Sequence, residues 1–294
     1  MKKHIVKLSM IKKSLLAYLK EDMNLSSRKA KSLLERGIQI NSKKAYGDSK
    51  LTDGDFLILE EANCHRDNTI PQKMNLSFLY EDDYILAVDK PPYMVVHPTK
   101  THLEGTLANG IRYYFDEKNI KEPVRFFNRI DMNTSGIVII PKSSQAHSLL
   151  DRYSADSMEK KYTAVVSGIL KNRTGRIELP VSNQSDTEGK RFISPDGNFA
   201  ITEYEVLAEY AGVASLLSVS IKTGRTHQIR VHLSNLGHPI LGDSLYGGDD
   251  TIIKRQALHA SEIEFSHPID KSHVTIKSGL PKDLASLIKS LKNE

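Results

Sequence analysis

The stretch that decides how this chain is organised is Asn128-Arg129-Ile130-Asp131-Met132-Asn133-Thr134-Ser135-Gly136. Apolar residues lie on both sides of it, with Val124, Phe126 and Phe127 before it and the β-branched run 137–140 after it. This pattern predicts two strands joined by a polar turn. A loop on a rigid sheet can direct the side chain of Asp131 into a cleft. The alternative is that Asp131 only hydrogen-bonds the backbone of its own turn.

Length and composition set the outer limits. The chain has 294 residues, of which 39% are hydrophobic and 26% charged, as in a soluble protein with one large domain and a small one. No apolar run approaches the roughly 18 residues that a membrane helix needs, and lysines interrupt any signal-peptide core. The single cysteine, Cys64, excludes an internal disulfide and a multi-cysteine metal site. We therefore expect a cytoplasmic protein that does not enter a membrane.

Positive charge is concentrated near the N-terminus. The formal net charge is +5, but residues 1–60 alone hold 13 Lys and Arg against 7 Asp and Glu. The remaining residues hold 28 basic against 29 acidic side chains. A basic region beside a neutral body indicates a polyanionic partner such as a nucleic acid. An ordinary soluble surface can show the same bias, so charge alone does not decide.

The basic region has its own structural pattern. Residues 11–36 predict two helices, the second capped by Ser26 or Ser27 and ended by Gly37. Short strands are predicted at 38–41 and 51–59. The second helix is expected to direct its basic residues away from its apolar side: Arg28, Lys29, Lys31 and Arg36. On the pattern alone, a small α/β module with a solvated charged face is equally acceptable.

A polar segment, 63–75, reads as a linker, and the elements after it are predicted from periodicity. The pattern of 80–98 predicts a strand, a Pro-Pro break and a second strand ended by Pro98. Further strands are expected at 161–168, 200–210, 215–221 and 262–265, and helices at 143–154 and 283–291.

A second polar stretch, residues 223–233, reads Thr-Gly-Arg-Thr-His-Gln-Ile-Arg-Val-His-Leu. Thr223 or Thr226 can cap a helix in which His227 and Arg230 lie within one turn of each other. A basic helical face is most often simply solvated. A metal site is not expected, because His227 and His232 do not share a helical face and no recognised ligand spacing is present.

Together these stretches resemble the RluA-type pseudouridine synthases. The sequence 128–136 resembles the family signature His-Arg-Leu-Asp-x-x-Thr-Ser-Gly, with Asn128 in place of the usual His. Residues 89–98 resemble the first family motif, with Asp89 and Tyr93 where Asn and Gly are common. The run 224–232, continued by 237–247, matches a third. The resemblance covers nearly the whole chain, with its motifs in the expected order.

The resemblance implies an enzyme that isomerises uridine to pseudouridine in RNA. It makes Asp131 the catalytic residue, pairs Arg230 with it, and places Tyr162 against the target uracil. Because a guanidinium holds a carboxylate with fixed bidentate geometry, we expect that geometry between Arg230 and Asp131. It also assigns Arg129 to the gap left by the displaced uridine. RNA contacts are expected from Arg225, His227 and Gln228. Because the reaction is neither a redox step nor an addition, no cofactor and no metal are expected.

Residues 10–60 resemble the S4-like RNA-binding domain, in which a basic helix face contacts phosphates. That resemblance assigns RNA binding to Arg28, Lys29 and Arg36. The expected architecture is α+β: an S4-like domain at 1–62, the linker at 63–75, and a catalytic domain at 76–294 with a mixed, mostly antiparallel sheet flanked by helices.

The expected substrate is large-subunit (23S) ribosomal RNA, modified by a monomeric protein. Two alternatives remain open. One is a catalytically silent RNA-binding or ribosome-assembly factor on the same fold. The other is a hydrolase using Ser135 with a histidine and Asp131, although no Gly-x-Ser-x-Gly elbow is present.

Overall fold

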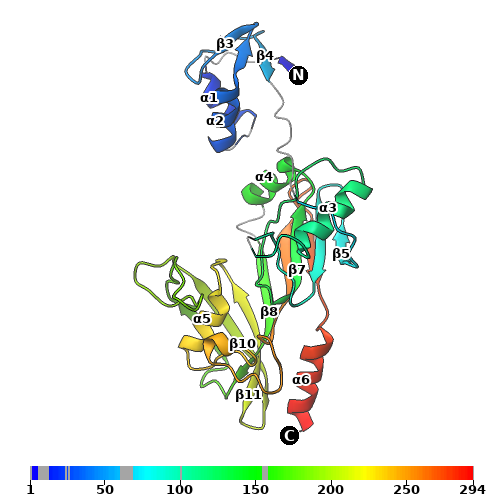
Figure 1. Ribbon diagram of the computed structural model, residues 1–294. Coiled ribbons are helices and arrows are strands. Elements are labelled where there is room, and N and C mark those ends of the chain that lie inside the picture. The colour runs from blue at the N-terminus through cyan, green and yellow to red at the C-terminus, as the bar shows by residue number, and fades with distance from the viewer. Residues whose placement is uncertain are drawn as a thin grey trace. The chain divides into compact units, whose positions relative to one another are not determined.

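A computed structural model describes residues 2–5, 13–23, 25, 27–59, 69–99, 101–153 and 158–293 (Figure 1). The chain divides into two compact units, Met1–Asp67 and Asn68–Glu294, which are considered separately. Within the described residues, no helix has the length and apolar character needed to cross a membrane.

The first unit contains the two predicted helices and a small sheet. The helices are α1 (Leu15–Glu21) and α2 (Ser27–Arg36), and the strands are β1 (Lys2–Ile5), β2 (Ile38–Ile40), β3 (Lys43–Ala45) and β4 (Phe56–Leu59). The strands pair in the order β1-β4-β2-β3. Leucines of α1 and β4 pack with Ala30 and Ile38 in one apolar core. Gly37 ends α2 at φ 97°, a conformation that glycine adopts without strain.

The predicted RNA-binding residues of this unit cannot be judged from the structure. The side chains of Arg28, Lys29 and Arg36, and all of Ser26, lie outside the described residues. The backbone of α2 is described, and its buried Ala30 marks the side that faces the core. The S4-like identity of this unit therefore stays a prediction.

The second unit is built on one nine-stranded sheet of order β5-β6-β7-β12-β8-β11-β10-β9, with β13 also paired to β12. Among the described residues of this sheet, β7 and β12 run parallel and the other paired strands are antiparallel. The predicted mixed, mostly antiparallel sheet is confirmed. The strands are β5 (Ser77–Glu81), β6 (Ile85–Lys90), β7 (Ser135–Pro141), β8 (Glu159–Ser167), β9 (Thr174–Glu178), β10 (Ile201–Tyr210), β11 (Ala214–Ile221), β12 (Leu258–Ser266) and β13 (His273–Lys277).

Helices cover both faces of the part of the sheet that carries the signature. The helices are α3 (Leu107–Glu117), α4 (Ser144–Tyr153), α5 (Gln228–Asn235) and α6 (Lys282–Asn293), with a 3₁₀ turn, η1 (Ser244–Tyr246). Val138 and Ile140 of β7 share a core with residues of α3, α5 and α6, whereas Ile137 and Ile139 pack with Leu150 of α4. Because β7 is buried on both faces, its sequence is a continuous apolar run. Figure 1 shows α3 beside β5 and β7, and α5 beside β10.

Two predicted strands are wrong. Residues 124–128 form no strand. The Phe127 N–H donates to Ile139 O (2.8 Å), and the next hydrogen bonds to β7 are made by the side chain of Asn128. Asn128 Nδ2 donates to Ile137 O (3.1 Å), while Ile139 N–H donates to Asn128 Oδ1 (2.7 Å). The amide thus pairs with β7 as a peptide group of a strand would. Residues 93–97 form no strand either, and Tyr93 turns the chain at φ 64°.

The predicted linker overlaps the second unit. Gln72 N–H donates to Asn109 O (3.0 Å), and the Gln72 side chain bonds both Glu104 and the Gly105 N–H. Asn109 Nδ2 also donates to Ile70 O (2.8 Å). Residues 70–72 therefore belong with α3 and the loop before it, because the backbone of Ile70 and Gln72 bonds Asn109 and the Gln72 side chain bonds residues 104 and 105.

Candidate active site

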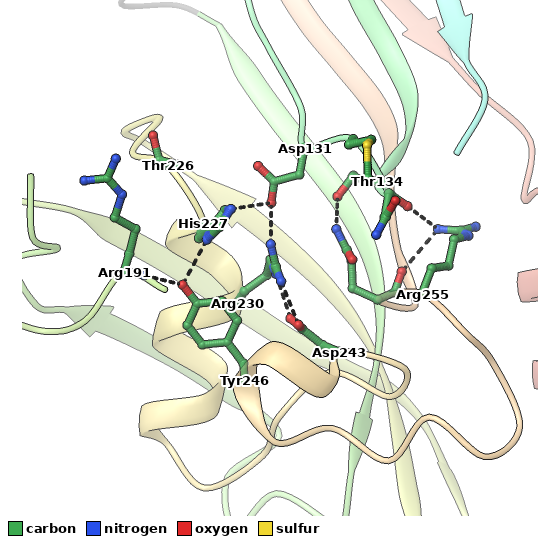
Figure 2. A network of polar contacts seen from close by, with 12 residues as sticks. Asp131, Thr134, Arg191, Thr226, His227, Arg230, Asp243, Tyr246 and Arg255 are labelled. Carbon is green, nitrogen blue, oxygen red and sulfur yellow. Dashed lines mark hydrogen bonds and ion pairs between the residues drawn. The ribbon is translucent and has the colours of Figure 1, made fainter. Parts of the chain in front are cut away.

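The turn that carries Asp131 is fixed from three directions. Its own Thr134 N–H donates to Asp131 O (3.1 Å). From β6, Lys90 Nζ donates to Met132 O (2.9 Å), and Arg255 Nη1 donates to Asn133 O (3.1 Å). Lys90 and Arg255 are 0% and 1% exposed, so both cations are held inside the protein. The Asp131 side chain is 26% exposed and projects from this braced turn (Figure 2).

Lys90 is a buried amine close to the carboxylate. Its Nζ lies within hydrogen-bond distance of Pro91 O, Met94 O and Met132 O, at 2.8–2.9 Å. Burial lowers the pKa of Lys90 to about 7, and the charge of Asp131 opposes this shift. Lys90 therefore connects the end of β6 to the turn that carries Asp131.

Arg230 reaches Asp131, but not with the fork that the sequence suggested. Arg230 Nη1 donates to Asp131 Oδ2 at 3.2 Å, a single contact. Nε and Nη2 donate to the two oxygens of Asp243, both at 2.7 Å (Figure 2). The predicted proximity of Arg230 and Asp131 is present, while the predicted bidentate geometry belongs to Asp243. A planar guanidinium can serve both carboxylates because its donors point in fixed directions.

The surroundings of Arg230 keep its charge compensated. The side chain is 8% exposed and that of Asp243 is 1% exposed. Burial opposes the charged form of Arg230, but Asp243 and Asp131 together raise its pKa. The guanidinium also lies 4.8 Å from the ring centre of Tyr246, within the range of a cation–π interaction.

A cavity opens beside Asp131. Its apolar walls come from Ile130, Tyr162, Ile221, Ile229 and Leu258. Asp131 is the only carboxylate among the described residues that line it. Tyr162 is 6% exposed, and burial, followed by the charge of Asp131, raises the pKa of its phenol. An aromatic ring and aliphatic side chains next to one carboxylate suit a planar base with a sugar at its edge.

The residues of this unit that were predicted to bind RNA differ in how accessible they are at the cavity. Arg129 and Arg225 are exposed and line the cavity, where Arg129 Nη2 donates to Thr226 Oγ1 (2.7 Å). His227 lines it as well and approaches Asp131. Gln228 is 3% exposed, and its amide bonds the Arg225 N–H, Ile201 O and two threonine hydroxyls. The structure thus gives the Gln228 side chain an internal role that leaves little of it to bind RNA.

The predicted helix cap is also wrong. Neither Thr223 nor Thr226 caps α5; the N-cap residue is His227, with no side-chain cap. Thr223 Oγ1 instead accepts from the Ile201 N–H (3.0 Å) and donates to Gln228 Oε1 (2.8 Å). His227 has a left-handed backbone, φ 58° and ψ 16°. This conformation costs a non-glycine residue about 1–2 kcal/mol, and strain of this kind is concentrated at functional sites.

The structure argues against the hydrolase alternative. Ser135 Oγ does lie 3.0 Å from His259 Nδ1, but the two residues are 2% and 0% exposed. The other nitrogen of His259 faces the carbonyl oxygen of Ser278 at 3.4 Å and not a carboxylate. A nucleophile without access to substrate and without an oriented base does not support acyl transfer. Among the described residues, no group of three or more His, Cys, Asp or Glu could hold a metal ion.

Sequence reasoning did not assign a role to four residues of the site: Lys90, Asp243, Tyr246 and Arg255. Asp243 and Tyr246 stood inside a recognised motif, but they are distant in sequence from Arg230 and His227. Lys90 is the last residue of the apolar strand β6 and stood inside the first family motif, but no role was assigned to it. The contacts of these four residues join β6, α5 and residues 242–258, which are distant in sequence and meet only in the folded chain.

Three comparisons relate this chain to known proteins. The family described as RNA pseudouridylate synthase matches residues 84–235. The chain is 34% identical to the Bacillus subtilis (strain 168) protein named "Uncharacterized RNA pseudouridine synthase YhcT", over 86% of this chain and 84% of that protein. It is 36% identical to "Ribosomal large subunit pseudouridine synthase D" of Xanthomonas campestris pv. campestris, over 76% and 72% of the two chains. The solved structure titled "Human RNA Pseudouridylate Synthase Domain Containing 1" has a TM-score of 0.56 and 26% identity, covering 75% of this chain and 96% of that one.

Proposed function

This chain belongs to the RNA pseudouridylate synthase family and is an isomerase acting on RNA, and we propose that it modifies uridines of large-subunit ribosomal RNA with Asp131 as the catalytic carboxylate. The observation that carries the catalytic part is the position of Asp131, which is the only acidic side chain among the described residues that line the cavity. The ribosomal substrate is supported by relatives named for the large ribosomal subunit.

The reaction explains why one carboxylate is enough. The bond between uracil N1 and ribose C1′ breaks, the base turns, and C5 bonds to C1′. The proton on C5 leaves and N1 gains one, so the product is an isomer of the substrate. Asp131 either attacks C1′ or removes a neighbouring ribose proton. Neither route consumes an oxidant or a nucleotide, and we propose that no cofactor or metal takes part.

The neighbours of Asp131 have separate tasks in this proposal. Arg230 orients the carboxylate through Nη1 while Asp243 fixes the guanidinium. Tyr162 packs against the uracil ring. Arg129 and Arg225, exposed at the cavity, contact the RNA, and Arg129 fills the space that the extracted uridine leaves. Extracting a base costs a few kcal/mol, which such contacts offset.

The N-terminal unit completes the proposal as an electrostatic RNA grip, with Arg28, Lys29 and Arg36 as its phosphate contacts. We include in it the monomeric state and the cytoplasmic location that the sequence suggests. The rival function is a silent RNA-binding factor on the same fold.

Mapping of pseudouridines in ribosomal RNA from a deletion strain tests the substrate. We expect one or more large-subunit positions to revert to uridine, and a plasmid copy of the wild-type gene to restore them. A complete set of ribosomal pseudouridines in the deletion strain, together with activity of the pure protein on another RNA, would reject the ribosomal assignment and keep the enzyme. A complete set with no activity on any RNA would favour the silent factor.

A further inference from the structure

His227 stands out among the residues around Asp131 because its backbone is strained and its ring is fixed. It is the N-cap residue of α5 and lies in the left-handed region, at φ 58°, and its side chain makes no capping hydrogen bond. The ring packs edge-on against Tyr246, with ring centres 5.7 Å apart. A helix start has no need of this conformation, since an ordinary cap residue is extended. The strain therefore points to a role for the side chain.

The hydrogen bonds of Tyr246 determine which ring nitrogen carries the proton. Tyr246 Oη accepts from the Arg191 N–H (2.8 Å) and lies 3.0 Å from His227 Nδ1 (Figure 2). The tyrosine is 3% exposed, and in the described part of the chain no other acceptor lies within hydrogen-bond distance of its hydroxyl. A buried hydroxyl proton without an acceptor is costly, so the Tyr246 hydroxyl donates to Nδ1. We assign the neutral His227 ring its proton on Nε2 accordingly.

The Nε2–H group points toward Asp131 but does not form a hydrogen bond with it. Asp131 Oδ2 lies 3.9 Å from Nε2, beyond the length of a hydrogen bond. The same oxygen already accepts from Arg230 Nη1. His227 lines the cavity with Tyr162 and also lines a second cavity, of about 310 Å³, on the side of Asp243 and Lys254. Asp131, His227 and Arg230 form the wall that the two cavities share.

We propose that His227 is a further catalytic residue, whose Nε2–H donates a hydrogen bond to an oxygen of the extracted uridine while Tyr246 fixes the ring. The inference rests on the proposed function of Asp131. The acceptor is an oxygen of the target nucleotide: the uracil O2 or O4, or the ribose 2′-hydroxyl. A preorganised neutral donor is effective where charge develops on the detached base, because it needs no rearrangement during the reaction.

The first test compares donors at one position. His227→Gln keeps an N–H group at similar reach, whereas His227→Phe keeps the ring and removes the donor. We expect the single-turnover rate to fall about 100-fold in the Phe variant, in line with the loss of one preorganised donor, and to fall much less in the Gln variant. RNA affinity should change little in either. Equal rates for wild type and the Phe variant, or equal losses in the Gln and Phe variants, would overturn the proposal.

The second test separates positioning from structure. Tyr246→Phe keeps the ring packing but frees Nδ1, so the rate should fall while RNA affinity stays near that of the wild type. The melting temperature should fall modestly, because the Arg191 N–H loses its acceptor. An unchanged rate in a folded Tyr246→Phe protein would show that the tautomer does not matter and would contradict the positioning role.

Substrate analogues identify the acceptor. RNAs with 2-thiouridine, 4-thiouridine or 2′-deoxyuridine at the target each weaken one acceptor. The wild type should lose rate with one of them, and the His227→Phe variant should lose nothing further with that same RNA. Losses that multiply for all three RNAs would mean that His227 contacts none of these atoms. The wild type must turn over the natural RNA and Asp131→Asn must not; if that fails, the proposed function is at fault and not His227.

Discussion

Asp243 holds Arg230 through two hydrogen bonds of 2.7 Å, and Arg230 gives Asp131 only its remaining nitrogen, at 3.2 Å. The carboxylate in the cavity is therefore positioned by a guanidinium that a second, buried carboxylate has already fixed. This arrangement fixes the guanidinium of Arg230 independently of Asp131.

Asp243→Asn tests this relationship. The amide keeps the shape but removes the charge that compensates Arg230, and breaking a buried ion pair costs about 3–5 kcal/mol. We expect a lower free energy of unfolding and a fall in kcat of at least about tenfold, measured by denaturant titration and by pseudouridine formation. The exposed Asp249, on the same loop, supplies the control: Asp249→Asn should behave as wild type. An Asp243→Asn protein with wild-type kcat would contradict the positioning role of the pair.

Asn128→Asp tests the amide that replaces a strand beside β7. A carboxylate of the same shape would place an oxygen against Ile137 O, where Nδ2 now donates at 3.1 Å. The free energy of unfolding should fall by about 1–3 kcal/mol, the cost of an unsatisfied buried polar group. Catalysis should fall as well, because residues 129–131 follow directly. Unfolding in urea that coincides with the wild type would show that this pairing does not hold the turn.

Lys90→Met tests how the buried amine affects the pH dependence of the free energy of unfolding. The pKa of Lys90 is lowered from 10.5 to about 7 by burial, so between those values the unfolded chain binds a proton that the native protein releases. Native stability contributed by this group therefore rises with pH from about 7 upward, by on the order of 1 kcal/mol per pH unit. The stability of the wild type, measured between pH 7 and 9, should rise relative to that of Lys90→Met. Parallel curves would mean that the three carbonyl oxygens around Lys90 keep it protonated.

The sequence predicted the parts of this molecule that depend on local pattern. The apolar run 137–140, the alternating residues of β8 and the two N-terminal helices follow from periodicity, and all are present. The expected strand before Asp131 failed because one side chain, Asn128, replaces the backbone pairing that a strand would make. The Thr caps failed because Gln228 takes the hydrogen bonds of that turn.

The site was predicted only in part for a related reason. The motifs located Asp131, Arg230 and Tyr162, which the fold brings to one cavity. The bidentate hydrogen bonds of Arg230 were assigned to Asp131 and are made to Asp243. The sequence could not show this, because the partners of a side chain depend on the tertiary fold and not on sequence spacing. Lys90 and Arg255 brace the turn from β6 and from the segment before β12, and the sequence does not show which backbone carbonyls they bond.

Removal of the first unit tests whether that unit contributes to RNA binding while the second unit carries out catalysis. Since residues 70–72 are bonded to α3, the truncated protein should begin at Asn68 and not at the end of the predicted linker. It should isomerise a minimal RNA but bind structured ribosomal RNA more weakly, with a shallower dependence of affinity on salt. Charge reversal at Arg28, Lys29 and Arg36 in the full chain should reproduce the weaker binding. Equal salt slopes for the three proteins would show that the first unit is not an RNA grip.

The central claim is that the carboxylate of Asp131 carries out the isomerisation. Because the C5 proton leaves in the reaction, RNA tritiated at C5 of uridine releases tritium to water with each turnover. Asp131→Asn keeps the size of the side chain and should lower this release by at least about 1000-fold, within the roughly 10²–10⁴-fold that a single catalytic group contributes. Its affinity for RNA should stay within about twofold of the wild type, since the contacts with phosphates are unchanged. Asp83→Asn, which changes an exposed carboxylate, serves as the control and should release tritium at the wild-type rate. Appreciable tritium release by pure Asp131→Asn would contradict the account.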